Sequence, residues 1–313
     1  MRVLLLAFSA VLGLATLLPA EPLDRSQVSA DARWLAHVDF DAVKTVKAGQ
    51  WIRDDWLNRE ATQEGLRKLR ETIGFDPAED LHSITSYGSR FEGGSGVMIL
   101  RAKVDRRLLM AYLQQRLGHE TNPYGDHQLH VWTQAKGKRG KQTMIGCFHQ
   151  PTVMVLGRDP AEVKLALDVL DGKAPGLVGS DSPCDADAPA GTVFEARATG
   201  LDSGDAPFKS PIFRRSDLIC VALGEQEGVT FFRGEMLAKS AEVAGQVRTV
   251  LEGLLAMAKL QHGSDEKILT VLQAFRVSAA ERTVTVEWRG PGDEVLKLIE
   301  QGWKQLAKSK QVD

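Results

Sequence analysis

Short segments in which apolar residues recur at every second position run along the whole chain, and this pattern restricts the fold more than any other feature. The first is residues 34–40, where Trp34, Ala36, Val38 and Phe40 share one side. Such spacing is typical of strands. It predicts further strands near 84–91, 97–104, 127–134, 141–149, 152–157, 192–201, 218–223, 229–237 and 283–288. Segments with helical spacing separate them, so we expect an α+β fold with mainly antiparallel sheets.

The helical segments carry recognisable start and stop signals. Apolar residues at helical spacing predict helices within 41–74, at 105–117, 240–261 and 264–275, one after Pro160, and a last one from 293. Asp105, Asp159 and Ser240 stand where capping side chains are favoured. Gly74, followed by Pro77, gives a stop signal.

Residues 174–190 concentrate Pro, Asp and Gly and lack any periodicity, which is typical of a linker. They divide the chain into an N-terminal domain, 31–173, and a C-terminal domain, 191–313, after a flexible N-terminus at 21–30. Each half is expected to be a mainly antiparallel sheet with helices packed on one face. Both halves begin with a strand and end with a hairpin and an amphipathic helix, a pattern that a duplicated unit would also produce.

The first twenty residues have the pattern of a secretory signal peptide. A short basic start, Met1-Arg2, precedes an almost wholly apolar run that ends at Ala20. We expect cleavage after Ala20 and a periplasmic or secreted protein with no membrane span after cleavage. Residues 3–20 are just long enough to cross a bilayer, so a retained N-terminal anchor is the alternative.

The charge balance argues against nucleic acid as a partner. Lys and Arg total 39 against 41 Asp and Glu, a net charge of -2, whereas nucleic-acid-binding domains usually carry a basic excess. Positive charges gather only locally, at Lys136, Lys138, Arg139 and Lys141. Because Gly137 and Gly140 lie within this run, it is predicted to be a hairpin tip, either solvated or in contact with an anionic envelope surface or partner.

Three cysteines are too few for a disulfide-built scaffold. Cys147 and Cys220 lie in strand-like segments, and Cys184 lies in the linker. In one alternative, all three cysteines are free thiols and two of them are buried. The other is a Cys147–Cys220 bridge, which requires the two strands to lie within about 7 Å of each other.

No motif for catalysis, metal binding or a cofactor stands out. The chain lacks Gly-x-Ser-x-Gly, His-Glu-x-x-His and Cys-x-x-Cys, and the glycines at 93–96 are expected in a hairpin loop without a following helix. His127 and His130 are three residues apart on a predicted strand, which places them on opposite faces. We therefore interpret them as polar positions of an exposed ribbon, and we predict no catalytic residue, no metal site and no cofactor.

His37 and Asp39 form the one pair with chemical potential. Their spacing of two places both side chains on one face of a strand, opposite Trp34, with Cα atoms about 6.5–7 Å apart. The pair could hold a ligand or a metal ion together. The simpler interpretation is a structural or solvent-facing pair.

Two segments carry a resemblance. The opening Asp31-Ala32-Arg33-Trp34-Leu35-Ala36-His37-Val38-Asp39, followed by a helix, and the helix start Lys239-Ser240-Ala241-Glu242-Val243-Ala244 resemble a family of secreted bacterial proteins with no assigned function. The resemblance spans most of the chain after residue 20. It implies export and an α+β fold, and it brings no catalytic residues.

These observations favour an exported, non-catalytic protein that binds a protein or a cell-envelope component. The alternative is an exported hydrolase or metal-dependent enzyme with a site near His37 and Asp39. A third hypothesis is a carrier that holds an apolar ligand between its sheet and its helices.

Overall fold

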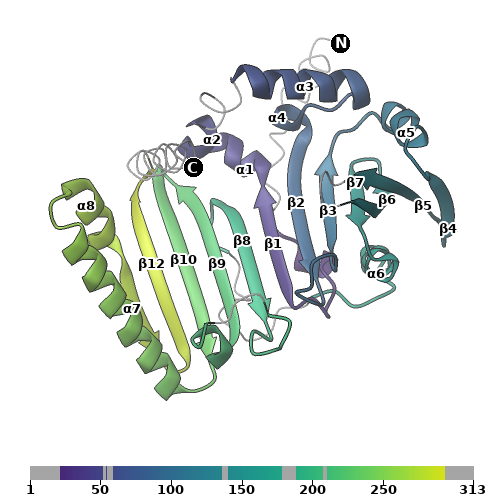
Figure 1. Ribbon diagram of the computed structural model, residues 1–313. Coiled ribbons are helices and arrows are strands. Elements are labelled where there is room, and N and C mark those ends of the chain that lie inside the picture. Colours follow the sequence, from purple (N-terminus) through teal and green to yellow (C-terminus); the bar gives the residue numbers. More distant parts are fainter. Residues whose placement is uncertain are drawn as a thin grey trace, which may run out of the picture.

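The strands of the two halves join in one continuous sheet. The computed structural model describes residues 22–51, 54, 59–135, 140–177, 188–206 and 210–292. Within them, twelve antiparallel strands form a single sheet in the order β11-β12-β10-β9-β8-β1-β2-β3-β7-β6-β5-β4 (Figure 1). The strands are β1 (Trp34–Asp39), β2 (Leu81–Gly88), β3 (Val97–Ala102), β4 (Glu120–Tyr124), β5 (His127–Ala135), β6 (Lys141–Gln150), β7 (Val153–Gly157), β8 (Thr192–Thr199), β9 (Ser216–Gln226), β10 (Val229–Ala238), β11 (Arg276–Ala280) and β12 (Thr283–Pro291).

The two halves of the sequence occupy separate blocks of this sheet. Strands β1–β7 form one block and β8–β12 the other, and β1 and β8 pair at the seam between them, with Trp34 opposite Ala198. Each block has its own apolar core. One is built around Val155 and Leu167, and the other around Met236 and Val247. The α+β class with a mainly antiparallel sheet is therefore confirmed.

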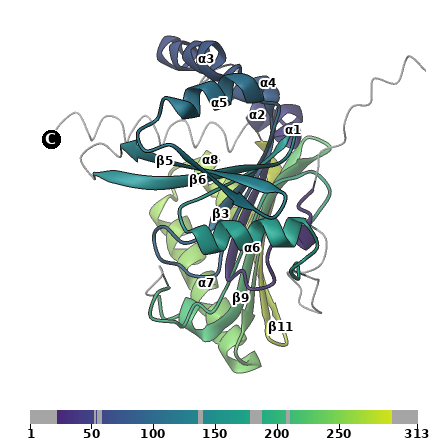
Figure 2. The same ribbon diagram turned by 90° about the vertical axis from the view of Figure 1, so that its right-hand side faces the viewer.

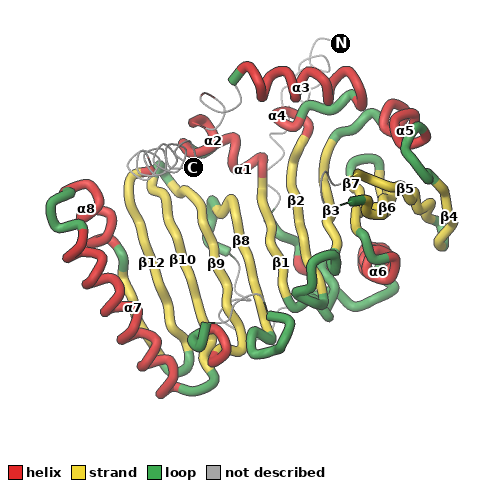
Figure 3. Tube along the Cα trace, viewed as in Figure 1, coloured by secondary structure: helices red, strands yellow, loops and turns green. Residues whose placement is uncertain are grey.

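Helices lie around the margins of the sheet (Figure 3). At one end, α7 packs on β11, β12 and β10, and α8 packs on α7 and β12. At the other end, β5 and β6 lie between α3 and α5 on one side and α6 on the other (Figure 2). The helical elements are η1 (Arg25–Gln27), α1 (Phe40–Thr45), α2 (Lys47–Trp51), α3 (Glu60–Ile73), α4 (Pro77–Asp80), α5 (Arg106–Gln114), α6 (Pro160–Leu170), η5 (Phe213–Arg215), α7 (Ala241–Gln261) and α8 (Glu266–Ala274).

The predicted helix signals act as expected. Asp105, Asp159 and Ser240 each accept a hydrogen bond from a backbone N–H in the first turn of α5, α6 and α7. Gly74 ends α3 with a φ of 62°, a left-handed conformation that glycine adopts without strain. The apolar face of α7 is only partly covered, because Val250 and Leu254 are about half exposed.

Residues 22–30, which were expected to be flexible, cover part of the sheet. Val28 is fully buried in the core beside α6, and its carbonyl accepts a hydrogen bond from Leu177 N–H. Ser29 forms a β-bridge with Gly176, so the first residues of the predicted linker are also tied to this segment. Residues 178–187 of that linker, the predicted signal peptide up to Ala20 and the predicted last helix lie outside the described residues.

None of the helices within the described residues has an apolar stretch of the length and hydropathy that crossing a membrane would require.

Candidate ligand-binding site

A cavity of about 460 Å³ lies between one face of the sheet and the helices α3 and α5. Most of its wall is apolar, and its polar groups are few. It is lined by Ile73, Phe75, Leu100, Val104, Leu109, Tyr112, Leu113, Arg116, His130, Trp132, Thr133, Gln134, Gly146, Cys147, Phe148, Met154 and Leu156. Its volume falls within the range of about 300–1,000 Å³ that is usual for small-molecule sites.

The alternation of side chains along β6 and β7 produces this cavity. Met154 and Leu156 point to the face that carries α5, whereas Val153 and Val155 pack into the core beneath α6. Both faces of these strands are apolar, so two helical layers can cover them. Gly146 lets Leu156 and Trp132 pack closely at the floor, because a Cβ at this position would meet their side chains at 3.0–3.2 Å.

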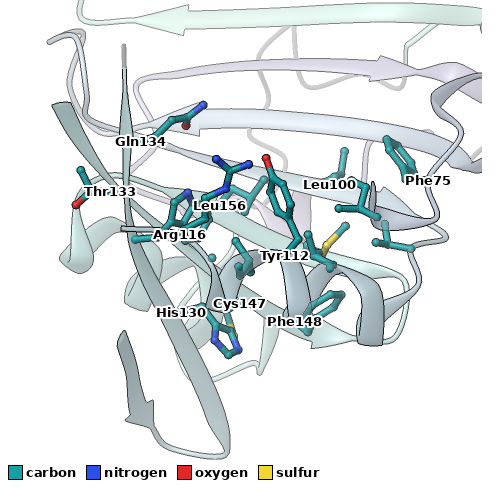
Figure 4. A pocket seen from close by; sticks show the side chains of 17 residues that line it. Phe75, Leu100, Tyr112, Arg116, His130, Thr133, Gln134, Cys147, Phe148 and Leu156 are labelled. Carbon is teal, nitrogen blue, oxygen red and sulfur yellow. The ribbon is translucent and has the colours of Figure 1, made fainter. Parts of the chain in front are cut away.

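The polar groups lie toward one side of the cavity. Figure 4 shows Thr133 and Gln134 on one side, Phe75 and Leu100 on the opposite side, and Tyr112 and Arg116 between them. The Arg116 guanidinium stacks on the Tyr112 ring, with its Cζ 3.9 Å from the ring centroid. This contact holds a permanent positive charge at the polar side of an otherwise apolar space.

His130 contributes a ring without a charge. It is buried and stacks on His119, with 5.6 Å between ring centroids and 10° between planes. Burial lowers the pKa of His130, and His119 and Arg106 lower it further. The imidazole is therefore neutral near pH 7, which leaves Arg116 as the one permanent charge among the described lining residues.

His37 and Asp39 share one face of β1 as predicted, but that face is buried rather than exposed. Val28 of the N-terminal segment packs in one core cluster with Leu35 on this face, and His37 and Asp39 are both at most 5% exposed. His37 Nδ1 lies 2.8 Å from Thr85 Oγ1, whereas Asp39 caps α1 by accepting from Ala42 N–H at 2.8 Å. The solvent-facing interpretation is therefore wrong, and the two side chains bind different partners.

A second, smaller cavity adjoins His37. Its volume is about 220 Å³, and its wall includes Thr85 and Arg101 from the sheet and Asp24 and Gln27 from the N-terminal segment. Asp39 does not line it.

The basic run falls largely outside the described residues: Lys136, Lys138 and Arg139 are not described, and Lys141 is exposed at the start of β6.

His127 and His130 lie on opposite faces of β5, as strand geometry predicts, but neither is an exposed ribbon position. His130 lines the cavity, whereas His127 Nε2 lies 2.9 Å from Asp171. His149 Nε2 lies 3.0 Å from the same carboxylate. The sequence interpretation missed this cluster because its members are 22 to 44 residues apart and only the pairing of β5 with β6 brings the histidines together.

The bridge considered between Cys147 and Cys220 is not formed. Cys147 is a free, buried thiol, and Cys220 is disulfide-bonded. Burial raises the pKa of the Cys147 thiol, which favours the protonated form over the nucleophilic thiolate.

The sequence matches no protein-family model and no curated protein. Two solved structures of TP0453 are similar in shape. Its crystal form III aligns with a TM-score of 0.48 and 8% identity over 90% of this chain and 99% of TP0453. Crystal form I aligns with a TM-score of 0.45 and 7% identity over 90% of this chain and 98% of TP0453.

Proposed function

We propose that this is an exported, non-catalytic binding protein that holds an envelope amphiphile with one long apolar chain and an anionic head. The observation that carries the proposal is the 460 Å³ apolar cavity with Arg116 on its polar side. The proposal combines two of the hypotheses drawn from the sequence. One is a protein that binds a cell-envelope component, and the other is a carrier that holds an apolar ligand.

The apolar wall would supply most of the affinity. Each methylene group removed from water contributes about 0.8 kcal/mol, so a long alkyl chain between Phe75, Leu100 and Phe148 gains several kcal/mol. A purely polar ligand would gain nothing from these side chains. The wall therefore favours a lipid-like molecule over a sugar, a nucleotide or a peptide.

Arg116 would select the head group. A guanidinium presents its N–H donors in a fixed plane that matches carboxylates and phosphates. Thr133 and Gln134 add neutral hydrogen-bonding groups on the same side of the cavity (Figure 4). A fatty acid satisfies both halves of the site, with its carboxylate toward Arg116 and its chain toward Phe75.

Two further observations support export. The apolar segment that ends at Ala20 has the features of a signal peptide. The disulfide at Cys220 is typical of proteins from oxidising compartments.

Two consecutive subdomains, 31–173 and 191–313, are also part of the proposal, whether or not one duplicates the other. Their separate apolar cores support it.

Replacement of Arg116 tests the head-group assignment. We expect Arg116→Gln to weaken palmitate binding about 10- to 100-fold, because a hydrogen bond to a charged group contributes about 1.5–3 kcal/mol. Competition with a fluorescent fatty acid measures this. Hexadecanol, which has the same chain and no charge, should bind both proteins alike.

Arg107→Gln is the matched control, because Arg107 is exposed on α5 and does not line the cavity. It should leave palmitate affinity unchanged. Equal palmitate affinity in Arg116→Gln and the unaltered protein would contradict the assignment of the head group.

The alternative, an exported hydrolase or metal-dependent enzyme near His37 and Asp39, is favoured only by the 220 Å³ cavity beside His37. The binding account expects His37→Ala to lower the thermal midpoint, because it removes the hydrogen bond to Thr85, and to change no activity. Loss of a hydrolytic activity at an unchanged midpoint would instead establish the enzyme.

A further inference from the structure

The cluster formed by His127, His149 and Asp171 lies on the face of the β5–β6 hairpin opposite the cavity. His127 begins β5, His149 lies near the end of β6, and Asp171 is the C-cap residue that follows α6. One candidate ligand atom from each residue lies within 4.8 Å of the other two. The two imidazole rings face each other at 5.4 Å between centroids. Two imidazoles and a carboxylate thus converge from three elements.

A cation already lies beside the cluster. The Lys173 ammonium lies 2.8 Å from Asp171 Oδ2. A carboxylate that binds an ammonium in this way can also bind a metal cation.

We propose that His127, His149 and Asp171 bind a zinc ion. Two His nitrogens and one carboxylate oxygen are a donor set that Zn²⁺ takes in tetrahedral sites, with water as the fourth ligand. At metal–ligand distances of about 2.0–2.1 Å the ligand atoms of such a site stand about 3.3 Å apart. His127 and His149 already place Nε2 at 2.9 and 3.0 Å from the oxygens of Asp171, so small side-chain rotations suffice.

Lys173 is the competing cation. Its side chain is about half exposed, so it can leave Asp171 for solvent when the metal binds. Because the Lys173 ammonium group is so exposed, separating it from the Asp171 carboxylate costs little free energy. Lys173 therefore lowers the affinity of the site without blocking it, and its removal should strengthen zinc binding.

His149 sets the expected strength of the site. Its Nδ1 is buried and has no hydrogen-bond partner among the described residues. Metal-bound histidines usually donate their other N–H to an acceptor, and loss of that partner weakens binding about 10- to 100-fold. We therefore expect a zinc affinity in the micromolar rather than the nanomolar range.

Calorimetric titration of the chelator-treated protein with zinc chloride tests the proposal. We expect one zinc ion per chain, and binding at least about tenfold weaker in His127→Ala and in His149→Ala. Lys173→Ala should bind zinc more tightly than the unaltered protein. A misfolded protein cannot bind zinc more tightly than the unaltered one. The Lys173→Ala measurement therefore tests the zinc site even where a histidine variant fails to fold.

His82→Ala is the matched control, because His82 Nδ1 also lies 2.8 Å from an aspartate, Asp41, but has no second histidine beside it. It should bind zinc like the unaltered protein. Unchanged zinc binding in a folded His149→Ala, or no gain in Lys173→Ala, would overturn the proposal. Palmitate binding should be the same with and without zinc, because the two sites lie on opposite faces of the hairpin.

Discussion

Leu156→Trp should abolish the binding of long-chain fatty acids. Leu156 lies on β7 among the residues that line the 460 Å³ cavity, close to Gly146. An indole in place of the isobutyl group fills space that the alkyl chain would occupy. We expect the affinity for palmitate to fall at least about 100-fold, which corresponds to about 2.8 kcal/mol. Competition with a fluorescent fatty acid measures the loss.

Leu254→Trp provides the control for this change. Leu254 is about half exposed on α7, at the far end of the sheet from the cavity (Figure 1). The same substitution there should leave binding intact. Because overpacking can cost about 1–3 kcal/mol of stability, circular dichroism must show that Leu156→Trp is folded. Undiminished palmitate binding in a folded Leu156→Trp would place the ligand elsewhere.

Leu167→Ala should destabilise the protein more than any surface change. Leu167 is fully buried on α6, where it packs into the core with Val155 and Val163. Its truncation removes apolar contacts and leaves a cavity, which typically costs about 2–5 kcal/mol in free energy of unfolding. Urea denaturation followed by circular dichroism measures this loss.

Leu254→Ala is the corresponding control, because its side chain is about half exposed and should cost less than about 1 kcal/mol. If Leu167→Ala costs no more than Leu254→Ala, then α6 does not pack on the sheet as described. Since α6 covers the face opposite the cavity, palmitate affinity should be similar in folded Leu167→Ala.

The central strands could be predicted from the sequence, and the edge strands could not. The strand beginning at Trp34 and the strands at 229–238 and 283–291 show clear alternation because one or both faces are covered. The two strands that the pattern missed, β4 and β11, are the two edges of the sheet. β4 is largely exposed and contains Pro123, and such residues are tolerated where one side of a strand has no partner.

Which face of a strand is buried was not predictable from alternation alone. In β1 the apolar residues Trp34, Ala36 and Val38 are only partly buried, whereas Leu35, His37 and Asp39 are buried. The reason is tertiary: Val28 and its neighbours fold back over that face. Nothing within residues 34–40 indicates this covering segment.

The candidate sites escaped the sequence for two different reasons. The cavity wall consists of residues such as Leu100, Phe148 and Leu156, which look like ordinary core positions until the spacing between α5 and the sheet is known. The cluster at Asp171 has no short motif, because its ligands come from two strands and the end of a helix. Both sites are products of topology rather than of local sequence.

Native mass spectrometry of the purified protein mixed with palmitate tests the central claim most directly. The account predicts one palmitate per chain in the unaltered protein and none in Leu156→Trp, because the cavity between α5 and the sheet holds a single alkyl chain. A ligand-free mass at saturating palmitate, or equal uptake by the two proteins, would contradict the proposed function.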